Sequence, residues 1–230
     1  LGLSCLGSLI NLPFLMRMPD SKETAIMPWF GRLVTGGLFR TLWTVDAITA
    51  TADPSKRLRA IRAIRPADGN LMLSDLAEAL EDPSPTVRRE ALMALGRIGT
   101  DEAIELLVWH LHEPDTGTRI ASAQALGQIP THEGTHPLLR ALHDDDRDVR
   151  RAAAKALSHR TDAQATEQLL SLITRDQDSE VLISAAEALS KLRESRAIRH
   201  LLHMSMESPN RMVRNQLVMA MGNLVGPPNQ

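Results

Sequence analysis

Residues 87–99 read VRREALMALGRIG, and closely similar strings follow four more times along the chain. The later copies start at Thr118, Val149, Val181 and Val213, so successive copies lie 31, 31, 32 and 32 residues apart. A more degenerate copy, KRLRAIRAIR, starts at Lys56. A fixed period in this range is typical of a solenoid, in which each unit packs mainly on its neighbours.

Each unit reads as two helices joined by a polar corner. The second helix, here called helix B, carries apolar residues at its first position and four, five, seven and eight positions later, which places them on one helical face. The first, helix A, carries apolar pairs such as Leu76 and Leu80. Corners such as EDPSPT at 81–86 end one helix and cap the next. We predict an all-α, right-handed α-solenoid of about five to six helical hairpins.

Two positions of helix B are small in every copy. The first predicts close approach of neighbouring helices and holds Ala94, Ala125, Ala156, Ala188 and Ala220. The second, two residues later, is expected to loosen the helix before the next unit and holds Gly96, Gly127, Ser158, Ser190 and Gly222.

The repeated pattern is an acid, five residues, an arginine and then A-x-x-A-L-G-x-I. It resembles the short bacterial HEAT repeats, the type also found in phycobilisome lyases, over about residues 53–226. The resemblance implies a HEAT solenoid. It is weak for function, because solenoids of this kind serve very different tasks.

Composition divides the chain near residue 52. Residues 1–52 hold five of the six aromatic residues and only seven charged residues, whereas 53–230 hold the other 47 charges and all the clear repeats. A net charge of −2 argues against general nucleic-acid binding. A single cysteine excludes an internal disulfide and makes a reducing compartment the default. We therefore predict two regions: an apolar N-terminal segment, 1–52, and the solenoid, 53–230.

Two interpretations of residues 1–52 stay open. The stretch LGLSCLGSLINLPFLM is uncharged for 16 residues, short of the about 20 that span a bilayer. Five basic residues follow within residues 56–65, as at the cytoplasmic side of a membrane segment. The segment is thus either a membrane-proximal helix, which would hold the protein in the cytoplasm at the inner face of the membrane, or a cap on the first repeat.

Charged residues at the corners predict a ladder of ion pairs between repeats. An acid precedes an arginine by six or seven residues in four units: Asp82 and Arg88, Glu113 and Arg119, Asp144 and Arg150, Glu207 and Arg214. The planar guanidinium suits such pairing. In the fourth unit, Arg175 stands at the acid position and Leu182 at the arginine position, so we expect that rung to be missing.

Metal and catalytic sites find little support. Asp144–Asp146 lack the glycine and glutamate of a calcium loop. The pairs His112-Glu113 and His132-Glu133, which resemble those of HEAT-type iron hydroxylases, fall in loops by the repeat phase. His200 and His203 could supply only two zinc ligands. We expect no metal, no cofactor and no catalytic residue.

The solvent-facing positions of helix B predict a concave surface with a basic lean, suited to an acidic peptide or helix. The expected contact residues are Arg59, Arg62, Arg97, Gln124, Gln128, Lys155, His159 and Lys191. Ordinary hydration of surface helices would explain the same residues. The sequence thus favours a non-catalytic protein-interaction scaffold, tethered at the membrane; the alternative is an accessory subunit of a bilin (tetrapyrrole) lyase.

Overall fold

The structure is a computed structural model that describes residue 48 and residues 53–225. Within these residues all regular secondary structure is helical. Helices B are α4 (Pro54–Arg62), α6 (Pro85–Ile98), α8 (Thr116–Gln128), α10 (Arg147–Leu157), α12 (Ser179–Lys191) and α14 (Arg211–Val225). Helices A are α5 (Gly69–Leu80), α7 (Asp101–His110), α9 (Thr135–Ala141), α11 (Ala163–Arg175) and α13 (Ala197–Glu207). The 3-10 turns η2 (Pro66–Asp68) and η3 (His132–Gly134) precede α5 and α9.

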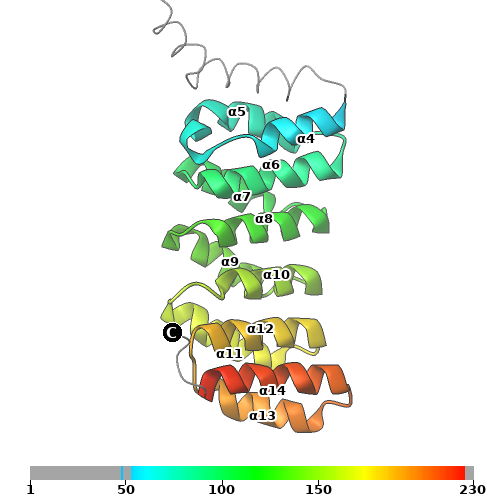
Figure 1. Ribbon diagram of the computed structural model, residues 1–230, viewed down its shortest axis with the longest axis vertical. Helices are drawn as coiled ribbons and strands as arrows, with labels where there is room; N and C mark the ends of the chain where they lie inside the picture. The colour runs from blue at the N-terminus through cyan, green and yellow to red at the C-terminus, as the bar shows by residue number, and fades with distance from the viewer. Residues whose placement is uncertain (1–47, 49–52, 226–230) are drawn as a thin grey trace, which may run out of the picture. The chain divides into compact units, whose positions relative to one another are not determined.

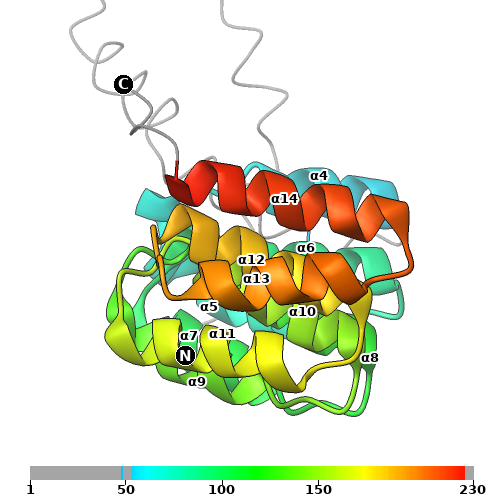
Figure 2. The same cartoon turned by 90° about the horizontal axis from the view of Figure 1, so that it is seen from below.

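The helices form two stacked rows (Figure 1). Each helix B packs along the next one, and each helix A packs against the helix B that follows it. Neighbouring helices A touch one another much less. Seen along the stack, helices B form an arc with α8 and α10 at its base and α4 and α14 at its ends (Figure 2). The all-α solenoid is therefore confirmed, and the helix B face is its concave side.

Small residues set the spacing of the helix B row. All five repeated alanines are buried. A Cβ added at Gly96 would lie 2.6 Å from the carbonyl oxygen of Ala125, and one at Gly127 would lie 2.7 Å from the Cβ of Ala156. Because α6 continues through Gly96 to Ile98, the expectation that this glycine loosens its helix was wrong. It allows close packing instead.

The polar corners cap helices B as the sequence predicts. The carboxylates of Asp115, Asp146 and Asp178 accept backbone N–H bonds from the first turns of α8, α10 and α12. Such caps satisfy donors that have no partner inside the helix. Asp146, one of the three consecutive aspartates, is thus used as a cap.

Arginines at the start of helices B link successive repeats. Nε and Nη2 of Arg119 donate to the two carboxylate oxygens of Asp144 in the next corner, at 3.0 and 3.1 Å. Nη1 of Arg119 donates to the carbonyls of Glu113 and Pro114 in its own corner. Arg150 makes the same contacts to Asp176, at 2.6 and 3.2 Å. Arg57 pairs with Asp82 at 2.6 Å. Each pair therefore joins one repeat to the following corner.

The prediction that the fourth unit lacks an ion pair at its corner was wrong, because Asp176 of that corner pairs with Arg150. Asp176 lies six residues before Leu182, the same spacing as from Asp82 to Arg88, so the acid position of this unit holds Asp176 and not Arg175. Burial raises the pKa of Asp176, but hydrogen bonds from Arg150 and the Asp178 backbone, with the charge of Arg150, outweigh it and leave the pKa lowered. The interruption falls one step later, where Leu182 replaces the arginine and Glu207 contacts His203 instead.

Two further expected ladder residues do not form ion pairs with their sequence partners. Arg88 donates to the backbone carbonyls of Asp82 and Pro83, and Arg214 donates to those of Ser208 and Pro209. Glu113 accepts a hydrogen bond from Arg119 through its backbone carbonyl, and its carboxylate forms no ion pair among the described residues. The six-residue spacing therefore brings an arginine to the carbonyls of its own corner, and the carboxylate it pairs with belongs to the next one.

One buried arginine replaces an apolar residue of the repeat. Equivalent positions hold Ile98, Ile129, Arg160, Leu192 and Leu224. The Arg160 guanidinium donates to the carbonyls of Leu126 and Ile129, at 2.7 and 2.8 Å, and to that of Thr131. Burial lowers the pKa of Arg160. This side chain therefore satisfies the backbone at the end of α8 from the next repeat.

The substitutions Gly96→Ala and Gly222→Ala should have opposite effects on stability. Gly96→Ala forces a methyl group against the α8 backbone and should lower the free energy of unfolding by about 1–3 kcal/mol. The Cβ at Gly222 meets nothing within 4 Å, so the better helix former should raise it by up to about 1 kcal/mol. Urea unfolding of both variants measures this. Equal effects would contradict close packing at Gly96.

Replacing Arg119 with leucine should test the inter-repeat pairs. Arg119→Leu removes a half-buried two-point contact and leaves Asp144 and two carbonyls without their donor, so we expect a loss of about 1–3 kcal/mol. Arg151→Leu is the control, because Arg151 pairs with Asp148 in an exposed contact worth at most about 0.5 kcal/mol. Thermal unfolding compares the two variants. Similar losses would show that the pairs do not tie the repeats together.

Candidate functional site

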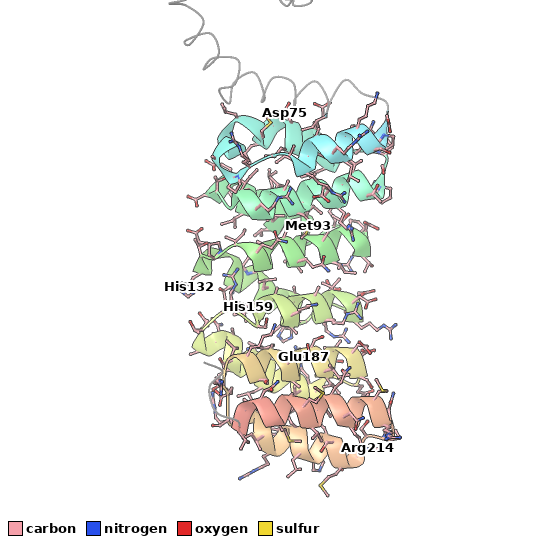
Figure 3. The ribbon with its side chains drawn as sticks, in the orientation of Figure 1. Asp75, Met93, His132, His159, Glu187 and Arg214 are labelled. Carbon is pink, nitrogen blue, oxygen red and sulfur yellow. The ribbon has the colours of Figure 1, made fainter. Side chains whose placement is uncertain are left out.

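A groove of about 600 Å³ runs across the concave face. Five helices B contribute to it, from α6 to α14, and Met93, His159 and Glu187 mark its course in Figure 3. Its lining consists of Met93, Ile120, Gln124, Gly127, Gln128, Asp148, Arg151, Ala152, Lys155, Ala156, His159, Glu180, Ile183, Ser184, Glu187 and Gln216. A groove that crosses five helices suits an elongated ligand more than a compact one.

Small residues form the floor of the groove, and polar residues form its walls. Ala152 and Ala156 of α10 are nearly buried, at 7% and 9% exposure, and lie beside Gly127. The same small side chains that let α8 and α10 approach therefore leave a depression above them. Larger apolar side chains line the groove at separate points, Met93 on α6, Ile120 on α8 and Ile183 on α12.

Four of the eight predicted contact residues line the groove: Gln124, Gln128, Lys155 and His159. Lys191 is exposed at the end of α12 but outside the lining. Arg59, Arg62 and Arg97 lie outside the lining as well, on α4 and α6. The structure thus brings together the middle of the predicted set, and not its N-terminal part.

The arginines near the N-terminal end are engaged in contacts within the protein. Arg62 and Arg97 both pair with Glu90, at 3.1 and 3.3 Å, and Arg97 also donates to the Ile61 carbonyl. Arg59 donates to the Ser55 carbonyl at 3.3 Å. Arg97, one of the predicted contact residues, is thus engaged within the protein, and its side chain joins α6 to α4.

Charges in the centre of the groove fall into two groups. Arg151 is engaged with Asp148 at 2.9 Å and lies 3.8 Å from Glu180. Among the described residues, Lys155 and Lys191 form no ion pair, and neither does Glu187, which occupies in α12 the position that Lys155 holds in α10. The uncommitted charge near α10 and α12 is therefore basic on balance, with Glu187 as its one acidic member.

Sequence reasoning missed several groove residues. Its expected contact residues lie six and ten residues after the first residue of helix B, and only Arg59 lies three after it. The positions one before, two after and three after the first residue supply Asp148, Ile120, Arg151, Ile183 and Ser184. The repeat register could have identified them, since all lie on the same helical face as Gln124 and Lys155.

Two other hollows lie at the corners. One, of about 720 Å³, is lined by Ile48, Arg57 and Asp82 among others, and another, of about 610 Å³, by His143, Arg150 and Asp176 among others. Because their charged walls are the inter-repeat pairs, these hollows offer fewer free groups. Within the described part of the chain, no three His, Cys, Asp or Glu side chains are placed to share a metal ion.

The comparisons with known proteins concern the repeat. A family model of HEAT repeats matches residues 42–127, 73–158 and 135–222. A comparison with curated proteins found no match. Among solved structures, an engineered protein is similar at 22% identity, over 80% of this chain and 96% of its own, with a TM-score of 0.49.

Two natural proteins are also similar in structure. Human deoxyhypusine hydroxylase is 17% identical, with 95% of this chain and 98% of its own covered and a TM-score of 0.40. The CpcE–CpcF phycocyanin lyase complex of Nostoc is 15% identical, with 91% and 98% covered and a TM-score of 0.39. The family model, which matches well over half of the chain, carries the conclusion. The chain belongs to the HEAT-repeat family.

Proposed function

We propose that this protein is a non-catalytic scaffold that binds a protein or peptide in the groove on its helix B face. HEAT repeats indicate a protein-interaction scaffold in general. The observation that carries the finer proposal is the groove itself, which crosses five helices and includes lining side chains, such as Gln124 and Lys155, that have no partner among the described residues. Binding energy can then be gathered from several repeats at once.

The free groups in the groove favour an acidic partner and do not favour nucleic acid. Lys155, His159 and the nearby Lys191 are exposed, whereas the arginines near them are paired within the protein. A nucleic-acid groove would need basic residues along its whole length to contact successive phosphates. Glu187, Glu180 and Asp148 line this groove and would repel a phosphate backbone.

The lyase alternative gains no support from the groove. A bilin-binding groove would be expected to carry aromatic side chains, and no aromatic residue lines this one. Trp109, the one tryptophan of the described chain, lies on helix A α7, 60% exposed, with its ring against His110. The groove therefore favours a peptide-binding scaffold over a pigment-handling subunit.

The membrane tether remains a prediction that falls on residues outside the described chain, 1–47 and 49–52. Ile48 is described, and it is 3% exposed and belongs to the solenoid core. At this one position the cap interpretation is favoured over membrane contact. In the residues that the structure describes, no helix has the length and apolar character needed to cross a bilayer. Localisation at the inner face of the cytoplasmic membrane stays part of the proposal.

Site-specific photocrosslinking should locate the partner on the helix B face. A benzophenone amino acid at Gln124 places the reactive group inside the groove, and the same residue at Arg140 places it on the exposed side of helix A α9. Irradiation in the cells that make the protein should yield a discrete adduct from position 124. The yield should fall when Lys155→Glu is added, because that change reverses a free groove charge.

Position 140 is the matched control, since Arg140 is exposed and takes part in no ion pair among the described residues. An adduct of the same mass and yield from position 140 would place the partner elsewhere and contradict the proposal. So would an adduct from position 124 that Lys155→Glu leaves unchanged.

A further inference from the structure

The groove carries amide and hydroxyl side chains that have no strong partner in the protein. The side chains of Gln124 and Gln216 are exposed and form no hydrogen bond within the described chain, and the Ser184 hydroxyl likewise forms none. Gln128 makes one weak contact, 4.0 Å from the sulfur of Met93. A glutamine carboxamide both donates and accepts hydrogen bonds, as a peptide backbone does.

We propose that the occupant of the groove is an extended acidic peptide segment, with an apolar residue that contacts α14. This inference rests on the proposed function and specifies the partner of the same site. The glutamine side chains hold the backbone of the segment, Lys155 and His159 hold a carboxylate, and Met212 and Met219 hold the apolar residue.

The floor of the groove argues against a docked helix. A helix binds in a groove through a continuous apolar stripe that receives residues at i, i+3, i+4 and i+7. Here Ile120 and Ile183 are separated by Arg151 on α10, and the alanines beside it are almost buried. An extended segment, by contrast, exposes N–H and C=O groups that require partners, which the glutamine amides provide.

The carboxylate of the peptide is expected to lie beside the basic side chains that form no ion pair in the described chain. Lys155 lies in the last turn of α10, His159 follows two residues after its end, and both line the groove, so both can contact one acidic side chain. Arg151, one turn earlier, is neutralised by Asp148 and Glu180. Glu187 on α12 faces the same region and would repel an acid, which favours a contact on the α10 side.

The apolar residue is placed by exposed methionines at the end of the groove. Met212 and Met219 of α14 are 65% and 70% exposed. They lie four residues before and three residues after Gln216, which lines the groove, and so share its helical face. The helix B face thus changes from basic at α10 to apolar at α14, where the two methionines flank the lining residue Gln216.

The distance between these two regions distinguishes an extended ligand from a helical one. Packed helices lie about 8–10 Å apart, so α10 and α14 are separated by about 16–20 Å. An extended chain covers this distance in about five or six residues, at about 3.3 Å each. A helix needs about 11–13 residues, at about 1.5 Å each. The spacing between the acidic and the apolar residue of a bound peptide therefore shows whether it binds as an extended chain or as a helix.

Selection from a peptide library tests the proposal. Linear displayed peptides of about 16 residues, long enough to cross the groove when extended, are selected on the full chain, 1–230. We expect enriched sequences to carry an acidic and an apolar residue about five or six positions apart. The far-UV circular dichroism of a synthetic winner should show no gain of helix on binding.

Matched variants locate the bound peptide. Lys155→Glu should weaken binding of the winner about tenfold or more, since it replaces a charge-assisted contact with a repulsion. Met219→Asp and the pair Gln124→Leu with Gln128→Leu should also weaken it. The controls Arg140→Glu and Met206→Asp make the same chemical changes on helices A, at exposed positions, and should leave the affinity unchanged.

Failures of the two proposals are distinguishable. Winners that respond to the groove variants but carry the helical spacing, or gain helix on binding, would overturn the extended ligand and keep the binding site. Winners that respond only to the helix A variants, or to neither set, would overturn the groove as the binding site itself.

Discussion

The contact between small residues of neighbouring helices B is the constraint on which the rest of this structure depends. Gly96 and Gly127 lie against Ala125 and Ala156 of the next repeat, closer than any added side chain would allow. Among the described residues, no glycine of a helix A lies against the next helix A, and neighbouring helices A touch one another less. Because one row packs more tightly than the other, the stack curves toward helices B and leaves its groove on that side.

Polar contacts at the two ends of helices B fix the repeats relative to one another. At the start of each helix, arginines such as Arg119 and Arg150 join a corner to the next corner. At the far end, Arg160 crosses from the third unit to the carbonyls that end α8. Together with other contacts inside the protein, they engage most of the arginines of the described solenoid. The charges that stay free, Lys155 and Lys191 among them, are therefore the ones that can meet a partner.

Much of the fold could be predicted from the sequence, since the repeat specifies it. Five in-phase copies place each helix, each corner and the buried alanines without reference to a structure. The role of Gly96 could not be read from one helix, because it depends on the backbone of the next. The pairing of Arg150 with Asp176 was missed for a related reason: the spacing within one unit does not show which carboxylate of the next corner an arginine meets.

The candidate site was only partly predictable. Exposure could be inferred from helical phase, which identified Gln124, Gln128, Lys155 and His159. Whether an exposed-looking arginine is free depends on neighbours far apart in the sequence. Arg97 donates to the Ile61 carbonyl of the preceding repeat and shares Glu90 with Arg62, and these contacts between repeats have no signature in its own repeat. The groove itself arises from small side chains on α8 and α10 together, so no single copy of the repeat could indicate it.

The central claim is that the helix B row is the more closely packed and forms the inside of the curve. Spin labels at Met93 and Met219 mark the inside, and labels at Glu78 and His203 mark the helices A of the same two hairpins. Pulsed electron paramagnetic resonance on the two doubly labelled proteins, with Cys5 replaced by serine, measures the distance between the two labels in each. The account predicts a shorter distance between the helix B labels than between the helix A labels. Equal distances, or a longer one on the helix B side, would contradict it.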